Sequence, residues 1–523
     1  MKKTINYLKA INTNWVFYPF FAFLSFFMCR QSAFAPFNIS GMRVDDCVFY
    51  YIGKAMTNGQ MPYRDIFDHK GPTLHLFNWL GASIAGRTGI WIIAMILMFV
   101  TFLFAYKACR NFTSPFASFF TIIAIAFIWV PSYGPGNKVE EYAIPFIFIA
   151  LYLFTCYFKN NYTFKKSQLF MLGFTFICVF MLRPNMVALW LVFCLSIIAM
   201  EIYKKRYENI FKYIGFFILG TLIYLIPVMT WIISTGTLKD FLYQFFTFNV
   251  LYTRSTTGVI NLLVVIKYFA SNLLLHGFAL IIIYTFYVIF FGKFVFRKKD
   301  ARPDYVKVNF VLIYGIYTLL SFALMIMSLR PYAHYFMPFL ACIVIPYAMS
   351  IDAVTDFISK FKLFRNKNIV RVVIAILILL SLHSLILEHN AIVQERKTET
   401  EEYKTLMNVS EIVKENTSPN DKISVFGNAT KFYIWSDRLS FSKYIYQLPA
   451  SDVDPSVSKG YIADFKASPP IILIIAGIGE YNKAYDTEIV KFLEEFKEEH
   501  YTLLDTVNRT EIYILNERVK AQT

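Results

Sequence analysis

The stretch Gly41–Pro72, GMRVDDCVFYYIGKAMTNGQMPYRDIFDHKGP, follows the first long apolar run of the chain and is dense in charge. Its titratable side chains include Asp45, Asp46, Arg64, Asp65, Asp68, His69 and Lys70. Charged groups are costly inside a lipid bilayer, and those that gather beside one usually have a function. This stretch is therefore expected to lie outside the membrane and to carry chemistry.

The segment VDDCVFYYIGKAMTNG within this stretch predicts a short amphipathic helix that stops at Gly59. The apolar residues that recur at helical spacing are Val48, Phe49, Ile52, Ala55 and Met56. Asp45 or Asp46 would stand at the helix N-terminus, where a carboxylate can cap the first backbone N–H groups. Capping explains one aspartate but not both. The polar turn PYRDIFDHKGP then precedes a new apolar helix that begins near Thr73.

The order of these parts carries a resemblance to a known class. A first apolar span is followed by Asp45 with VFYYIG, then by GQMPYRD, and then by DHKGP at the start of an apolar helix. This order resembles bacterial membrane glycosyltransferases of the GT-C class, which are similar to protein O-mannosyltransferases and lipid A aminoarabinose transferases. That class uses sugars linked to polyprenyl phosphate, and an acidic residue of its first outer loop is the catalytic base. The resemblance implies this role for Asp45.

The composition is that of a polytopic membrane protein. The 523 residues are 57% hydrophobic and only 16% charged, against about 25% in a soluble domain. The formal net charge is +16, and the Lys and Arg residues lie largely between apolar runs. This pattern indicates that they orient the chain in a membrane rather than bind nucleic acid. The seven cysteines include no CxxC pair, so neither a zinc site nor a disulfide framework is predicted. Cys47 is the only one expected to meet an oxidising compartment.

Apolar runs of about twenty residues can cross a bilayer, and Lys and Arg gather in the loops on the cytoplasmic side. These rules predict about eleven crossings, with a cytoplasmic N-terminus and an extracytoplasmic C-terminus. The expected crossings are 15–34, 89–106, 114–130, 142–158, two within 168–200, 212–234, one within 270–292, 308–328, 336–354 and 372–387. Residues 73–85 are apolar but too short to cross, so they are expected to lie along the outer surface.

The run 168–200 has basic residues at both ends, so it is expected to cross twice as a hairpin. At 1.5 Å per residue it supplies only about 50 Å of helix for two passages of about 30 Å. The turn, at Arg183-Pro184-Asn185, is therefore expected below the outer surface. A guanidinium facing lipid there would cost about 3 kcal/mol, which predicts that Arg183 faces a polar cavity. The alternative is that Arg183 extends outward to the lipid headgroups.

From Glu388 onward the composition changes to that of a small soluble domain. Buried strands are predicted at 421–426 and 470–475, an amphipathic helix at 487–500, and further strands at 501–506 and 511–515. We therefore expect two domains. Residues 1–387 would form the transmembrane glycosyltransferase domain, and residues 388–523 a small extracytoplasmic α/β domain.

Sugar transfer from a lipid phosphate needs a base for the acceptor, cations or a metal for the departing phosphate, and a cavity open to lipid and water. Asp45 is the candidate base. The candidates for substrate binding are Asp46, Arg64, Asp68, His69, Lys70, Glu140, Glu141, Arg183, Arg330, His334 and Tyr335. Arg183 and Arg330 suit phosphate because a guanidinium stays charged and binds phosphate oxygens in bidentate geometry.

Several of these candidates keep an ordinary structural alternative. Glu140 and Glu141 lie in a segment that resembles the GN..EE loop of GT-C proteins, but two glutamates at a helix N-terminus also favour the helix dipole. The sequence does not say which of the two matters. RPYAHYF, at Arg330 to Phe336, again resembles the family. The charges of DHKGP could instead form an exposed cluster, with Asp65 and Asp68 fixing the turn through local hydrogen bonds.

The resemblance implies transfer of a single hexose or pentose from a polyprenyl-phosphate-linked donor to a lipid-linked or cell-surface glycan. The reaction would take place on the extracytoplasmic face of the cell inner (plasma) membrane. The expected partners are this donor, the glycan or lipid acceptor and membrane lipid, with no nucleic acid. No cofactor is defined, and a divalent metal is left open because no HExxH motif or carboxylate triad specifies one. The alternatives are a transporter or flippase, or a polymerase, of lipid-linked glycans.

Overall fold

The computed structural model describes residues 17–134, 136–254, 261–275, 305–361, 365–448, 450–476 and 488–517. The chain divides into two compact units that alternate along the sequence. The first unit comprises Met1–Gln31, Ile92–Ile226 and Ile260–Val393. The second unit comprises Ser32–Trp91, Pro227–Val259 and Gln394–Thr523. The composition change at Glu388 thus lies near one boundary between the units, while two earlier segments also belong to the second unit.

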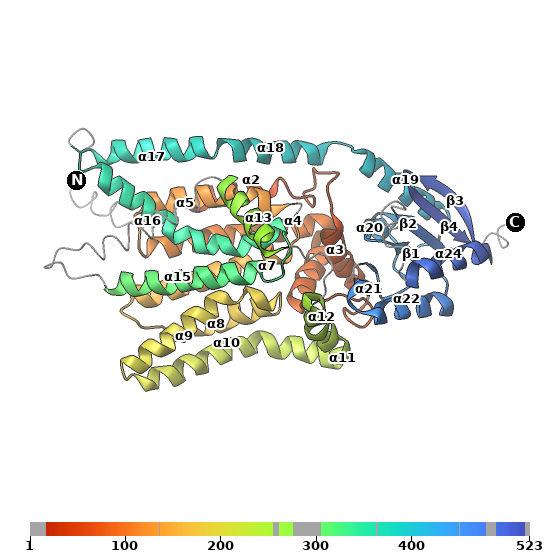
Figure 1. The fold of residues 1–523 in the computed structure, drawn as a ribbon, viewed down its shortest axis with the longest axis horizontal. Helices are drawn as coiled ribbons and strands as arrows, with labels where there is room; N and C mark the ends of the chain where they lie inside the picture. Colours follow the sequence, from red (N-terminus) through yellow and green to blue (C-terminus); the bar gives the residue numbers. More distant parts are fainter. Residues whose placement is uncertain are drawn as a thin grey trace. The chain divides into compact units, whose positions relative to one another are not determined.

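The first unit is a bundle of apolar helices (Figure 1). Its elements are α2 (Phe17–Cys29), α5 (Pro115–Ile128), α6 (Val130–Tyr133), α7 (Val139–Lys159), α8 (Lys166–Phe180), η2 (Pro184–Met186), α9 (Ala188–Tyr203), α13 (Leu262–Leu275), α15 (Tyr305–Ile326), η4 (Ala333–Phe339), α16 (Leu340–Ile358) and α17 (Lys367–Ser381). Helices α4 (Pro72–Arg110), α10 (Tyr207–Ser234) and α18 (His383–Lys397) each include a boundary between the units. Helix α7 is apolar on all its faces and is largely buried, as expected for the interior of a bundle.

Among the described residues, five helices are long and apolar enough to cross a membrane. They are Pro72–Arg110, Val139–Lys159, Tyr207–Ser234, Val306–Ile326 and Ala333–Ile358. A sixth span is obtained if Lys367–Ser381 and His383–Glu415, bent by 42°, are taken as one. Four shorter apolar helices among the described residues, α2, α5, α8 and α9, lie in other predicted spans. The span predicted within 270–292 lies mostly outside the described residues, so the count of about eleven crossings stays a prediction.

The turn predicted within 168–200 is present, because α8 ends at Phe180 and α9 begins at Ala188 with the short helix η2 between them. That these two helices cross the membrane stays a prediction. Arg183 stands directly before η2. Helices α8 and α10 then approach each other closely at two glycines. A Cβ atom on Gly173 would lie 1.8 Å from the carbonyl oxygen of Phe217, and one on Gly220 would lie 1.8 Å from that of Phe170. Small residues are what allow membrane helices to approach backbone to backbone.

Helix α4 contains a break that the sequence predicts as the boundary between residues 73–85 and 89–106. Ala85 and Gly86 have non-helical backbone angles. Gly86 has φ +56° and ψ −130°, a conformation in which a Cβ atom is strongly disfavoured. The backbone also comes very close to itself there, since a Cβ atom on Gly89 would lie 2.0 Å from the carbonyl oxygen of Gly81. The apolar run is thus two helices joined by a sharp bend.

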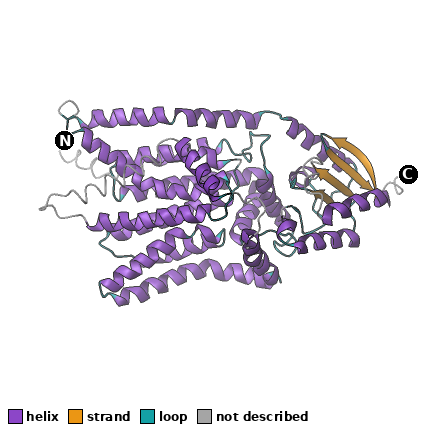
Figure 2. Cartoon of the chain, in the orientation of Figure 1, coloured by secondary structure: helices purple, strands orange, loops and turns teal. Residues whose placement is uncertain are grey.

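The second unit holds all the described strands, in one four-stranded sheet (Figure 2). The strand order is β1-β2-β4-β3, with bounds Ile423–Phe426, Ile472–Ala476, Thr510–Leu515 and Tyr501–Val507. Strand β1 pairs parallel with β2, and the other two pairings are antiparallel. The four strands and the helix α24 (Glu488–His500) confirm the elements predicted for this region. Phe465 of α22 (Pro455–Ala467) packs against Phe492 and Phe496 of α24.

The remaining elements of the second unit are mostly short helices. They are α3 (Val44–Thr57), α11 (Leu238–Leu242), the π-helix η3 (Tyr243–Thr247), α12 (Phe248–Arg254), α19 (Glu401–Glu415), α20 (Lys431–Ser436) and α21 (Ala450–Val453). The first loop is bound to the C-terminal segment within this unit. The backbone N–H of Phe67 donates to the carbonyl of Lys443 at 2.8 Å, and that of Ser440 donates to the hydroxyl of Tyr51 at 2.8 Å.

Candidate functional site

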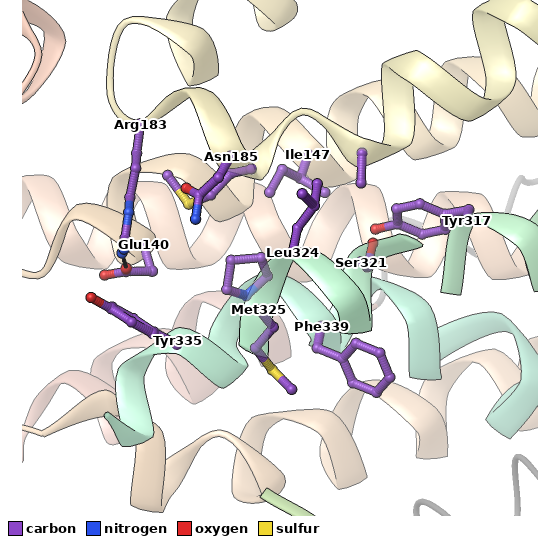
Figure 3. Close-up of a pocket in the computed structure, with 13 residues that line it drawn as sticks. Glu140, Ile147, Arg183, Asn185, Tyr317, Ser321, Leu324, Met325, Tyr335 and Phe339 are labelled. Carbon is purple, nitrogen blue, oxygen red and sulfur yellow. Dashed lines mark hydrogen bonds and ion pairs between the residues drawn. The ribbon is translucent and has the colours of Figure 1, made fainter. Parts of the chain in front are cut away.

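The described part of the first unit contains an open pocket of about 470 Å³. It is lined by Glu140, Ile147, Arg183, Asn185, Met186, Ala188, Tyr317, Ser321, Leu324, Met325, Tyr335, Pro338 and Phe339. Arg183, Glu140 and Tyr335 lie together on one side, and Tyr317, Ser321 and Phe339 lie on the other (Figure 3). A pocket with a charged end and a largely apolar wall suits an amphipathic ligand.

Arg183 is held at the charged end by two partners. Its Nη1 donates a hydrogen bond of 2.7 Å to Glu140 Oε1, and its guanidinium carbon lies 4.2 Å from the centroid of the Tyr335 ring. The side chain of Glu140 is buried, while that of Arg183 keeps 21% of its surface exposed. Arg183 therefore lines a pocket. That it faces a polar cavity below the outer membrane surface stays a prediction.

The two neighbouring glutamates separate into different structural roles. Glu141 is the third residue of α7, and its carboxylate accepts the backbone N–H of Lys138 and of Asn137, each at 3.2 Å. This is the capping arrangement that satisfies N–H groups at a helix N-terminus. Glu140 lines the pocket and holds Arg183. The ordinary alternative of helix capping therefore accounts for Glu141, and Glu140 is the pocket residue.

The other candidates of the first unit differ in their positions. Arg330 is 1% exposed and is not among the residues that line the pocket. His334 stacks on Tyr332 with ring centroids 5.5 Å apart and lies edge-on to Tyr335 at 4.8 Å. Of the segment RPYAHYF, Tyr335 is thus the residue that reaches the pocket.

In the second unit, the aspartate pair of α3 separates in the same way. Asp46 is buried, and its Oδ2 accepts the backbone N–H of Arg43 at 3.1 Å, which is the capping contact. Asp45, one residue earlier, is exposed. The helix runs from Val44 to Thr57, and Gly59 follows with φ +82°, which confirms the predicted helix and its stop. Capping therefore accounts for Asp46 and leaves the side chain of Asp45 accessible to solvent.

A cluster of polar side chains surrounds Asp68 in the second unit. The hydroxyl of Tyr446 donates to Asp68 Oδ1 at 3.0 Å and lies 3.4 Å from His69 Nδ1, while His69 Nε2 lies 2.7 Å from Lys70 Nζ. His75, which is 0% exposed, approaches the other carboxylate oxygen of Asp68 at 3.6 Å. We call Asp68, His69, Lys70 and Tyr446 the DHK–Tyr446 cluster.

Burial dominates the electrostatics of this cluster. It raises the pKa of Asp68 to about 6, although Lys70 and the hydroxyl of Tyr446 act in the opposite direction. Burial also raises the pKa of Tyr446 well above its usual value, and the charges of Asp68 and Asp45 add to this rise. The candidate base Asp45 thus interacts electrostatically with the cluster.

Arg64 and Asp65 interact mainly with each other and with their own loop. Arg64 Nε donates to Asp65 Oδ1 at 2.8 Å, and Asp65 Oδ2 accepts the backbone N–H of Met61 at 2.8 Å. Arg64 also donates to the carbonyl of Thr235 at 3.1 Å. The expectation that Asp65 fixes the turn through local hydrogen bonds is confirmed.

The structure thus collects the sequence candidates into two groups. Glu140, Glu141, Arg183, Arg330, His334 and Tyr335 belong to the first unit, and Asp45, Asp46, Arg64, Asp68, His69 and Lys70 belong to the second. Over the described ranges, no group of three or more His, Cys, Asp or Glu side chains is placed to hold a metal ion. Sequence reasoning missed Tyr446, because one tyrosine among 35 gives no signal of its own.

Comparison with solved structures identifies the fold. The chain is similar to ArnT from Cupriavidus metallidurans bound to undecaprenyl phosphate, with a TM-score of 0.60, 10% identity, and coverage of 96% of this chain and 98% of that chain. ArnT in the apo state gives a TM-score of 0.62 with 9% identity and the same coverage. The resemblance to the GT-C class that the first loop carries is confirmed at the level of the fold.

An archaeal protein shares this fold less closely. The oligosaccharyltransferase of Archaeoglobus fulgidus, tethered with an acceptor peptide containing the NVT sequon, gives a TM-score of 0.51 with 12% identity, over 94% of this chain and 73% of that chain. No curated protein matches the sequence. A family model described as "Putative competence-induced protein Ccs4 N-terminal domain" matches residues 9–407.

Proposed function

The chain belongs to this competence-induced Ccs4 N-terminal domain family, and from its GT-C fold we propose that it is a membrane glycosyltransferase. It transfers one hexose or pentose from a polyprenyl-phosphate-linked donor to a lipid-linked or cell-surface glycan acceptor. The reaction takes place on the extracytoplasmic face of the cell inner membrane. The observation that carries the proposal is the pocket of the first unit, in which the partly buried Arg183 lies beside an apolar wall. The fold is shared with a protein whose structure was solved with undecaprenyl phosphate bound.

The pocket supports a donor with a phosphate and a hydrocarbon chain. A guanidinium offers paired N–H donors that match phosphate oxygens, and it keeps its charge in a partly buried place. The apolar wall includes Ile147, Leu324, Met325 and Phe339, which suit isoprenoid carbons. In this arrangement Arg183 binds the phosphate, and Glu140 and Tyr335 set the direction of the guanidinium.

Asp45 acts as the general base for the acceptor hydroxyl in this proposal, and the reaction inverts the anomeric centre. Its accessible position at the first turn of α3 supports that role, because a base must reach the proton that it removes. Asp46 holds the turn in place through its cap on Arg43. His69 and Lys70 contribute positive charge for an anionic part of the substrate.

The proposal is tested with the full-length protein in liposomes that contain a radiolabelled sugar on undecaprenyl phosphate and an extract of lipid-linked glycans as acceptor. We expect label to appear in the glycan and free undecaprenyl phosphate to accumulate in equal amount. The matched control is Arg183→Ala, which should strongly reduce transfer because the phosphate loses its guanidinium. Movement of intact lipid-linked glycan across the bilayer without transfer of label would replace the proposal with a flippase.

A further inference from the structure

The side chain of Tyr446 connects the C-terminal segment with the first loop, within the second unit. Its hydroxyl is 3.0 Å from Asp68 Oδ1 and 3.4 Å from His69 Nδ1, although Tyr446 and Asp68 are 378 residues apart in the sequence. Both side chains are buried. A buried hydroxyl between a carboxylate and an imidazole fixes the direction of the hydrogen bonds around it.

The donors and acceptors of this cluster have one consistent assignment while Lys70 carries its charge. A lysine ammonium can only donate, so His69 Nε2, 2.7 Å from Lys70 Nζ, must accept. A neutral imidazole that accepts at Nε2 carries its proton on Nδ1, so Nδ1 donates to the oxygen of Tyr446. The hydroxyl of Tyr446 then donates to Asp68. The bonds therefore run from Lys70 through His69 and Tyr446 to Asp68.

The backbone beneath this chain of hydrogen bonds is held independently. The Asn249 side chain donates to the carbonyl of His69 at 2.7 Å, and the hydroxyl of Tyr63 donates to the carbonyl of Lys70 at 2.9 Å. Gln244 accepts the backbone N–H of Asp68 at 3.0 Å. Because these contacts fix the main chain without Tyr446, what Tyr446 adds is control over the His69 ring and, through it, over the ammonium of Lys70.

We propose that Tyr446 is a positioning residue that holds Lys70, through His69, as a recognition cation for the phosphate group of the lipid substrate. The inference rests on the proposed function for the identity of the phosphate-bearing lipid. It makes residues 394–523 part of substrate recognition rather than an accessory domain. Tyr446 itself needs no contact with the substrate.

The test measures the protection of Lys70 from an amine-modifying reagent, read by mass spectrometry on the full-length protein in detergent. Undecaprenyl phosphate is titrated against the wild type, Tyr446→Phe and the matched control Tyr444→Phe. We expect the lipid to protect Lys70 in the wild type and in Tyr444→Phe, and Tyr446→Phe to need about tenfold more lipid, since one directed hydrogen bond to a charged group is lost. Inorganic phosphate alone, at the same concentrations, separates a free phosphate site from a lipid phosphate site.

The proposal is overturned if undecaprenyl phosphate fails to protect Lys70 in the wild type, or protects it equally well in Tyr446→Phe. Protection by inorganic phosphate alone, with no further effect of the lipid, also overturns it. If Tyr446→Phe does not fold, His69→Phe breaks the same chain while keeping an aromatic ring between Phe248 and Tyr252, and the same loss of protection is expected. Sugar transfer is assayed on the same samples, so protection without transfer contradicts the proposed function and leaves this inference standing.

Discussion

Arg183 donates a hydrogen bond of 2.7 Å to Glu140, and this pair forms the charged end of the pocket in the first unit. The glutamate side chain is 3% exposed and the arginine 21%, so both charges are largely removed from water. A buried ion pair is a weak source of net stability, but removing one partner leaves the other charge uncompensated. Glu140 therefore compensates the charge of the Arg183 guanidinium, to which the proposed function assigns phosphate binding, in a place where an unpaired charge would be costly.

Glu140→Gln is expected to lower the free energy of unfolding by about 3 kcal/mol, because Arg183 loses its charged partner in a partly buried site. Glu141→Gln is the matched control. Its amide oxygen can still accept the backbone N–H groups of Asn137 and Lys138, so the loss should stay below about 1 kcal/mol. Thermal unfolding of the two variants in the same detergent measures the difference. Equal losses of unfolding free energy in the two variants would contradict the assignment of Glu140 to the ion pair and Glu141 to the helix cap.

Asp68→Asn is expected to stabilise the protein at neutral pH. The folded protein raises the pKa of Asp68 from 3.8 to about 6, so the folded state binds the proton more tightly than the unfolded chain. The free energy of unfolding therefore falls by up to about 3 kcal/mol as the pH rises from below 3.8 to above about 6. The asparagine avoids this loss and can still accept from Tyr446.

Unfolding of Asp68→Asn and the wild type is compared at pH 4.5 and pH 7.5. The variant should gain stability relative to the wild type at the higher pH and little at the lower. Asp65→Asn is the control with the opposite sign, because its hydrogen bond to Arg64 holds the pKa of Asp65 below its usual value. Asp65→Asn should therefore not be more stable than the wild type at pH 7.5. A gain for Asp68→Asn that is the same at both pH values would contradict the electrostatic explanation.

Gly173→Ala is expected to destabilise the first unit, since the new methyl group would lie 1.8 Å from the carbonyl oxygen of Phe217. Helices α8 and α10 must separate to accept it, at a cost of about 1–3 kcal/mol. Gly215→Ala, on the partner helix α10, meets no atom within 4 Å and should be neutral or gain up to about 1 kcal/mol of helix propensity. Thermal unfolding in detergent checks both. Similar behaviour of the two variants would mean that the helices do not pack at Gly173.

The elements that the sequence predicted correctly depend on nearby residues. The stop of α3 at Gly59, the break of α4 at Ala85 and Gly86, and the turn at Arg183-Pro184-Asn185 all follow from glycine, proline and apolar run length. The strands near the C-terminus follow from apolar runs between turn residues. Local rules suffice for these because neighbours along the chain determine them.

What the sequence could not predict depends on residues far apart in the chain. The contact of Tyr446 with Asp68 requires a loop of the C-terminal segment to reach the first loop. The spacing of apolar and polar residues along the sequence does not predict such a long-range contact. The division of each acidic pair into a member that caps the helix and a member that does not was also open, because both members of each pair stand in the first turn of a helix. Asp46 and Glu141 both stand third in their helices, and from that position the carboxylate turns back onto the backbone before the helix.

The central claim, that Asp45 is the base of a sugar transfer, is tested most directly by comparing transfer rates of the wild type, Asp45→Asn, Asp46→Asn and Asp505→Asn at equal membrane abundance. Asp505 is an exposed aspartate of strand β3 and serves as the charge-matched control. We predict that Asp45→Asn lowers the rate by about 10²–10⁴, the usual contribution of a general base, while the other two variants keep most of it. Full transfer by Asp45→Asn, with loss in Asp46→Asn, would contradict the account.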